Sequence, residues 1–145
     1  MSYRIVPRTP AGERLIAAAS GLRDVFQERS EGADRANEIC AENYTDMQAA
    51  GITAAFVPEE LGGIGLRSMH DWIAAIATLA KGDGSAAIAI SMHLSATRGL
   101  AALYSSSKPS SAPRNRAKAL LEAVAAREML ICSTTTERGN DNLHP

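Results

Sequence analysis

Hydrophobic residues recur every three or four positions along most of this chain, which is the period of an amphipathic α-helix. Leu15, Leu22 and Phe26 share one such face, and Gly51 stands where a left-handed residue would end a second helix. The pattern predicts about five helices, or about six if the second helix breaks near Asn43. The expected helices span about residues 10–29, 34–50, 68–81, 85–104 and 114–127.

The third and fourth of these helices differ in how their apolar side chains are distributed. In the third helix, Ser68 and Asp71 resemble a capping box. The predicted buried stripe of this helix consists of Trp72, Ile73, Ile76, Leu79 and Ala80. Residues 85–104 are instead apolar nearly all the way round and rich in small side chains, which predicts a central helix enclosed by other helices.

The connection between the second and third helices loses the helical period over residues 52–66 and contains glycines at positions 62, 63 and 65. A glycine-rich loop can cradle a phosphate, but these glycines follow no predicted strand and lack the GxGxxG spacing. We therefore expect them to form turns, with Phe56 and Leu61 lying under the loop.

The period changes again after the fifth helix. Residues 129–136 contain Leu130, Ile131 and three consecutive threonines, a composition that favours a strand. A lone strand leaves both rows of its backbone groups unpaired, so it needs a sheet supplied from elsewhere. The sequence thus predicts an all-α fold, a helical bundle of about five to six helices with one C-terminal β-strand, truncated as a second domain begins.

The charge balance argues against two classes of partner. With 15 Lys and Arg against 16 Asp and Glu, the chain offers no basic footprint for nucleic acid or for an anionic membrane surface. No run reaches the roughly 18 apolar residues that span a bilayer, and the N-terminus lacks a signal-peptide pattern. Cys40 and Cys132 lie far apart with no CxxC pair, so neither a metal site nor a disulfide is indicated. We expect a cytoplasmic protein.

Several joints of the chain resemble the acyl-CoA dehydrogenase family, and the resemblance covers nearly the whole sequence. Residues 50–52 followed by residues 57–66, VPEELGGIGL, are similar to the family's helix-end glycine and its proline–acidic–glycine-pair segment. Residues 81–85, KGDGS, resemble the family's connection into its buried helix. Residues 126–128, ARE, with the apolar strand and the Thr-Glu pair at 136–137, resemble the beginning of the family's middle β-domain.

The resemblance implies a domain layout and a chemistry. Residues 1–128 would be the N-terminal helical domain, and residues 129–145 the first strand and start of a truncated middle β-domain. Members of the family hold FAD between their domains and between subunits of a homo-oligomer, and they dehydrogenate the α,β bond of acyl-CoA thioesters in fatty acid metabolism. Their carboxylate base would lie downstream of Pro145. We therefore assign no catalytic residue here and expect a fragment that forms one wall of the substrate and flavin cleft and is inactive alone.

The resemblance also nominates site residues. Ser133, Thr135 and Thr136 occupy the positions at which the family's first strand contacts the flavin, where backbone N–H groups and a hydroxyl can hydrogen-bond the ring edge. Without the family, a run of threonines is more simply a β-former. His93 would border the substrate cleft, although a histidine on an apolar helix is usually a core residue with a satisfied ring nitrogen.

Residues 138–141, RGND, are shorter than the family pattern and lack its proline and serine, which leaves the chemistry open. One alternative is a flavin-dependent monooxygenase of the same fold that uses oxygen on an aromatic or amine substrate. Another is a stand-alone helical protein that binds a partner and has no flavin. Both flavin hypotheses predict an exposed apolar face where further protein would pack, and hence a tendency to associate.

Overall fold

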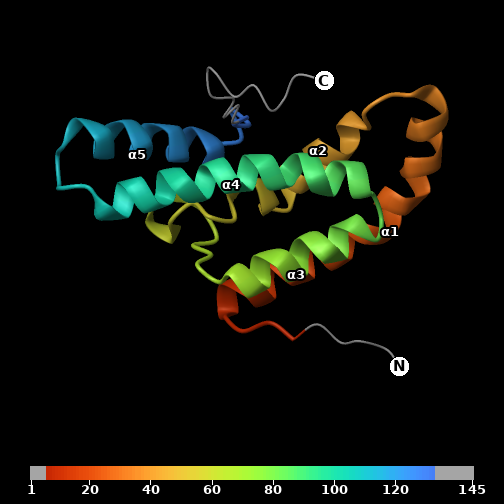
Figure 1. Ribbon diagram of the computed structural model, residues 1–145, viewed down its shortest axis with the longest axis horizontal. Helices are drawn as coiled ribbons and strands as arrows, with labels where there is room; N and C mark the ends of the chain where they lie inside the picture. Colours follow the sequence, from red (N-terminus) through yellow and green to blue (C-terminus); the bar gives the residue numbers. More distant parts are fainter. Residues whose placement is uncertain (1–5, 133–145) are drawn as a thin grey trace, which may run out of the picture.

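The computed structural model describes residues 6–132 (Figure 1). These residues form five α-helices and two 3₁₀ turns, and no strand occurs among them, so the all-α fold class is confirmed. The elements are α1 (Pro10–Ala36), α2 (Ala41–Ala49), η1 (Ile52–Ala54), η2 (Glu59–Leu61), α3 (Met69–Ala80), α4 (Gly84–Ser106) and α5 (Ala112–Ala125). Residues 129–132, at the start of the predicted strand, have no regular secondary structure, and the rest of that strand lies outside the described residues.

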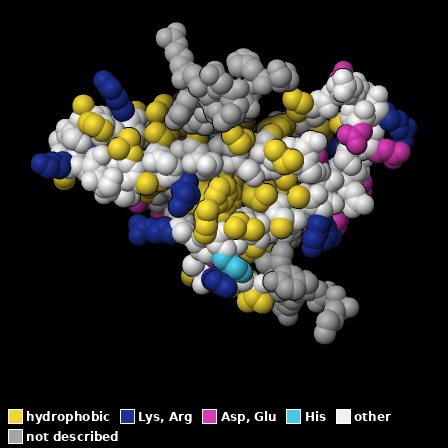
Figure 2. Space-filling view, in the orientation of Figure 1, with side chains coloured by type: hydrophobic (Ala, Val, Ile, Leu, Met, Phe, Trp, Pro, Cys, Tyr) yellow, Lys and Arg dark blue, Asp and Glu magenta, His cyan; other side chains and the backbone are white. Residues whose placement is uncertain are grey.

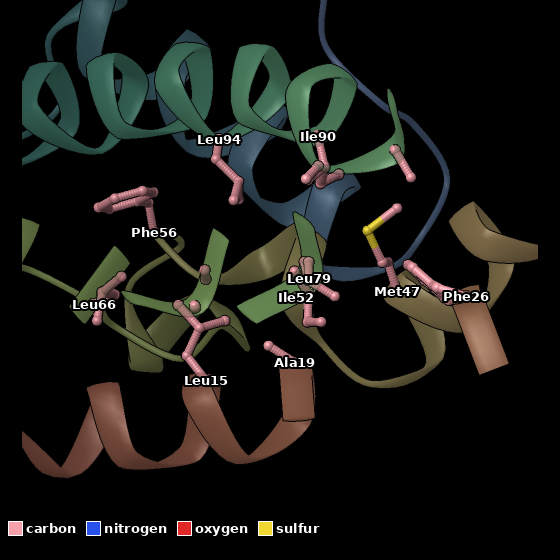
Figure 3. Close-up of a cluster of buried hydrophobic side chains, with 14 residues drawn as sticks. Leu15, Ala19, Phe26, Met47, Ile52, Phe56, Leu66, Leu79, Ile90 and Leu94 are labelled. Atoms are coloured by element: carbon pink, nitrogen blue, oxygen red, sulfur yellow. The ribbon is translucent and has the colours of Figure 1, made fainter. Parts of the chain in front are cut away.

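Helix α4 lies between two helical layers. Helices α1 and α3 pack against each other and α3 packs against α4, while α5 lies along the other side of α4 (Figure 1). The main hydrophobic core joins α1, α2, α3 and α4 (Figure 3). Its large buried side chains are Leu15, Phe26, Met47, Ile52, Phe56, Leu66, Leu79, Ile90 and Leu94.

The first helix is longer than its apolar pattern predicts. It continues to Ala36, where Asn37 adopts a left-handed conformation with φ of 53° and the N–H of Glu38 donates to the carbonyl of Ala33. A second helix starting at residue 34 is therefore wrong, because those residues still belong to α1. Polar surface residues extend a helix without leaving any hydrophobic signal, and here the end is set by the cap.

Helix α3 turns a different face to the core from the one its bulky residues suggest. Ile73 is 61% exposed and Ala80 is also exposed, so the predicted stripe is wrong at both positions. The buried face instead carries small residues such as Ala74 and Ala75. They allow close packing on α1, where a Cβ added to Gly12 would lie only 2.1 Å from the Asp71 carboxylate.

Helix α4 is central but not enclosed on all sides. Ala87, Ile90 and Leu94 are buried, whereas Ile88 is 72% exposed and Met92 is 50% exposed, so the prediction of burial all the way round is wrong within the described chain. Its length and hydropathy would also suit a membrane span, a test that core helices of soluble proteins pass as well. Helix α4 is therefore apolar on all sides, but within residues 6–132 other elements bury only part of its surface.

The connection from α2 to α3 has the predicted character. Gly51 is left-handed, with φ of 75°, and directly follows the C-cap residue of α2. Phe56 is buried and Leu61 half-buried under the loop. Gly63 packs so closely on Val57 that an added Cβ would lie 2.1 Å from the Val57 carbonyl oxygen.

Candidate functional site

His93 lies on the buried side of α4 and joins two segments that are distant in the sequence. The side chain is only 3% exposed. Its Nε2 lies 2.8 Å from the carbonyl oxygen of Thr53, and its Nδ1 lies 2.9 Å from the backbone nitrogen of Ile131. Because the N–H of Ile131 donates to Nδ1, the ring proton sits on Nε2 and is donated to Thr53. The ring therefore bridges η1 and the segment that follows α5.

The surroundings of His93 favour its neutral form. Burial lowers the pKa of the imidazole, and the hydrogen bond to the Thr53 carbonyl opposes that effect without overcoming it. Both ring nitrogens are occupied, so a ligand could exchange a proton with His93 only after one of these bonds opened. The role of His93 in a substrate cleft stays a prediction.

The segment held by His93 is also seated by apolar contacts. Met129 and Ile131 pack against a second hydrophobic cluster between α4, α5 and the loop. The buried members of this cluster are Ala54, Val57, Tyr104, Ala117, Leu121 and Val124. Upstream, Arg127 is left-handed with φ of 65° and redirects the chain after α5. The left-handed Arg127, the apolar contacts and the hydrogen bond to His93 together fix the course of the chain after α5.

Ser133, Thr135 and Thr136, the residues predicted to contact a flavin, lie outside the described residues, so their role stays a prediction. Ser133 is the second residue after Ile131. The described structure therefore brings His93 into contact with the segment that leads directly into the predicted cofactor strand.

Some large apolar side chains of α3 and α4 are exposed. Ile88 and Met92 of α4 and Ile73 of α3 are half or more exposed. Figure 2 shows hydrophobic side chains gathered over α4 and toward α3 on one face of the molecule. Large exposed apolar patches mark surfaces that bind other protein or a ligand, as both flavin hypotheses require.

No group of three or more metal-ligating side chains occurs within residues 6–132. Arg114, one of three cations at the start of α5, is used within the fold. Its guanidinium lies 3.9 Å from the centre of the Tyr104 ring and donates to the Tyr104 carbonyl. Arg114 therefore fastens α5 to the end of α4.

The family profile described as "Acyl-CoA dehydrogenase, N-terminal domain" matches residues 16–108, from the first turns of α1 to just past the end of α4. The chain belongs to the acyl-CoA dehydrogenase family. The match includes His93 and the loop with its three glycines, and it ends before the segment that His93 holds.

Curated relatives within this family extend the similarity further along the chain. The amino sugar nitrososynthase DnmZ of Streptomyces peucetius is 31% identical over 131 residues, covering 90% of this chain and 32% of that protein. The L-evernosamine nitrososynthase of a Micromonospora species is 32% identical over 126 residues, covering 87% of this chain and 30% of that protein. This chain thus spans about a third of the length of the relatives it matches.

Two solved structures share the fold. The nitrososynthase from Micromonospora carbonacea var. africana superposes with a TM-score of 0.84 at 29% identity, over 93% of this chain and 34% of that one. KijD3 in complex with dTDP superposes with a TM-score of 0.79 at 26% identity, over 86% of this chain and 32% of that one. The acyl-CoA dehydrogenase N-terminal fold is therefore shared with KijD3 and with an enzyme named for a different reaction.

The sequence nominated His93 but not its partners. Thr53 and Ile131 contribute backbone groups, and a backbone group leaves no trace in a side-chain pattern. The apolar residues around Ile131 were the only available signal, and they were interpreted as the beginning of a strand.

Proposed function

We propose that this chain forms the N-terminal helical wall of a flavin-dependent monooxygenase that adds oxygen to the amine of a nucleotide-linked amino sugar. The observation that carries the proposal is the similarity to two sugar nitrososynthases over 87–90% of this chain. A third relative, the amino sugar nitrososynthase RubN8 of Streptomyces rubradiris, is 28% identical over 133 residues. A nitroso group on a sugar is an oxidised amine.

FAD is the cofactor we infer, and when bound it would supply the redox chemistry with oxygen. The role of this chain is to form one wall of the substrate and flavin cleft and to position the segment after α5. His93 and the second hydrophobic cluster seat residues 129–131, and the predicted flavin contacts at Ser133, Thr135 and Thr136 follow that segment in the sequence. The exposed face at Ile88 and Met92 would be covered by further protein or border the sugar. No residue of this chain is assigned as a catalytic base.

Dehydrogenation of an acyl-CoA, with a role in fatty acid metabolism, is the second candidate, and the match to the family profile favours it. Both candidates share the cofactor, a homo-oligomeric assembly and a cytoplasmic location, which we propose on the family's pattern. The stand-alone alternative without flavin accounts less well for the large exposed side chains of α3 and α4.

A chimaera would test the proposal. The matching N-terminal part of the Streptomyces peucetius relative is replaced by this chain, and a dTDP-linked amino sugar is incubated with the chimaera, reduced flavin and oxygen. We expect the oxygenated amine to appear by mass spectrometry. As a matched control, the same part is replaced by the N-terminal domain of a fatty-acyl-CoA dehydrogenase, which should give no oxygenated sugar.

The result against the proposal is a chimaera that folds and binds FAD but leaves the amino sugar unchanged. That result would leave the second candidate as the better account of the family match.

A further inference from the structure

An open cavity that His93 does not line lies between the start of α1, the loop before α3 and the C-terminal half of α4. Its volume is about 820 Å³. The residues that line it include three arginines, Arg14, Arg67 and Arg98, and two carboxylates, Glu59 and Glu60. This groove is large enough for a nucleotide, since small-molecule sites in proteins commonly measure about 300–1,000 Å³.

Arg14 is already paired within the protein and forms part of the wall of the groove. Arg14 donates to Glu59 Oε1 at 2.5 Å and to the carbonyl oxygen of Ile64 at 2.9 Å, which ties the loop to α1. This pair neutralises itself and orders the loop around Gly65, where an added Cβ would lie 2.8 Å from the Glu59 side chain. The groove therefore has a built wall on its loop side.

The other two arginines are available to a ligand. Arg67 and Arg98 are exposed, and within residues 6–132 neither makes a salt bridge or a side-chain hydrogen bond. They come from the loop before α3 and from α4, so they reach the groove from different elements. Against them stands the single carboxylate of Glu60. The uncommitted charge of the groove is thus positive, on a chain whose net charge is −1.

The floor of the groove is apolar. Phe56 and Leu66 line it from the core side, and Ala101 and Ala102 line it from α4. In Figure 2 a Lys or Arg side chain borders the hydrophobic area beside the left half of α4. Arginines pair with phosphoryl oxygens in a bidentate manner, and an apolar floor suits the face of a base or sugar. This combination fits an anion that carries a ring system.

We propose that the groove binds the nucleoside diphosphate part of the substrate, with Arg67 and Arg98 contacting the diphosphate and the nucleoside lying on the apolar floor. The inference rests on the proposed function and names a site for the nucleotide on this chain. It is in keeping with the presence of dTDP in the KijD3 structure, which superposes on 86% of this chain.

The test is dTDP binding to this chain by isothermal titration calorimetry, with thymidine and inorganic pyrophosphate as partial ligands. R67Q and R98Q each remove one charge from an exposed side chain, so both variants should fold. We expect each to weaken dTDP binding about tenfold, the effect of losing roughly one charge-assisted contact, and added salt to weaken it further. E60Q, which removes the opposing carboxylate, should strengthen binding.

R116Q is the matched control, because Arg116 is an exposed arginine of α5 that does not line the groove. It should leave the affinity for dTDP unchanged. Three results would overturn the inference: no binding of dTDP to the chain, binding that R67Q and R98Q leave unchanged, or thymidine binding as tightly as dTDP. None of these results bears on the chimaera assay, in which the rest of the relative can supply the nucleotide site.

Discussion

Asp71 of α3 holds the N-terminal segment before α1, whereas His93 of α4 holds the C-terminal segment after α5. In both places a buried side chain accepts a backbone N–H from a distant stretch, at 2.8 Å from Arg8 to Asp71 and at 2.9 Å from Ile131 to His93. The two acceptors differ in charge. Asp71 is held as an anion, while His93 is held neutral.

The difference follows from the number of donors. Burial would raise the pKa of Asp71, but hydrogen bonds from His70, the backbone of Arg8 and the hydroxyl of Thr9 outweigh burial and lower the pKa to about 2. His93 has one backbone donor and one backbone acceptor, which cannot offset burial, so its pKa falls below 6.5. A buried group stays charged when several donors converge on it and stays neutral when its partners are balanced.

Replacing Asp71 should have the largest effect. D71A leaves the N–H of Arg8 and the hydroxyl of Thr9 without their acceptor, and we expect a loss of about 3 kcal/mol in the free energy of unfolding, measured by urea denaturation. D34N, at an exposed carboxylate of α1, is the control and should change little. A loss below about 1 kcal/mol for D71A would contradict the account.

Replacing His93 should cost less and act locally. H93A removes both backbone contacts, and we expect a loss of about 2 kcal/mol together with faster hydrogen exchange at the amide of Ile131. T97V removes a neighbouring hydroxyl that bonds only the carbonyl of His93, so it should leave that amide protected. Unchanged exchange at Ile131 in H93A would mean that His93 does not hold the segment.

Removing the hydroxyl of Thr9 should have a smaller effect. It caps α1 by accepting the N–H of Gly12 and donates to Asp71. We expect T9A to lose about 1 kcal/mol, close to the cost of an N-cap, on the same denaturation scale. S111A removes the N-cap of α5, which makes no contact with a carboxylate, and should cost somewhat less. If T9A costs no more than S111A, the bond from Thr9 to Asp71 adds nothing.

Lowering the pH should affect the two regions at different pH values, and of the four changes it should alter the global stability least. The pKa of His93 is lower in the folded chain, so its contribution is complete above pH 6.5 and is lost as the pH falls through the folded pKa. The contribution of Asp71 is complete above its ordinary pKa of 3.8 and is lost toward about 2. Exchange at Ile131 should therefore rise in acid before exchange at Arg8 does. The reverse order would contradict the assigned charges.

Helix positions were predictable where the chain marks its own boundaries. Gly51, Ser68 and Gly82 are local signals, and the structure places helix ends within two residues of each. The end of α1 was missed because Asn37, unlike glycine, gives only a weak left-handed signal. The exposed side of α4 was missed because Ile88 has the same composition signal whether further protein covers it or not.

The site was predictable only in part, and for a related reason. His93 stands out as a histidine among apolar residues, but its partners are backbone groups 40 residues before it and 38 residues after it. The groove was missed because Arg67 and Arg98 are ordinary surface residues in the sequence. Only the fold brings them to one cavity.

The central claim is that a neutral His93 holds the segment after α5. Its most direct test is the protonation state of His93 at neutral pH, measured from the nitrogen-15 chemical shifts of the imidazole ring. The account predicts a neutral ring with the proton on Nε2 and with Nδ1 accepting the N–H of Ile131. A protonated ring, or a proton on Nδ1, would contradict it.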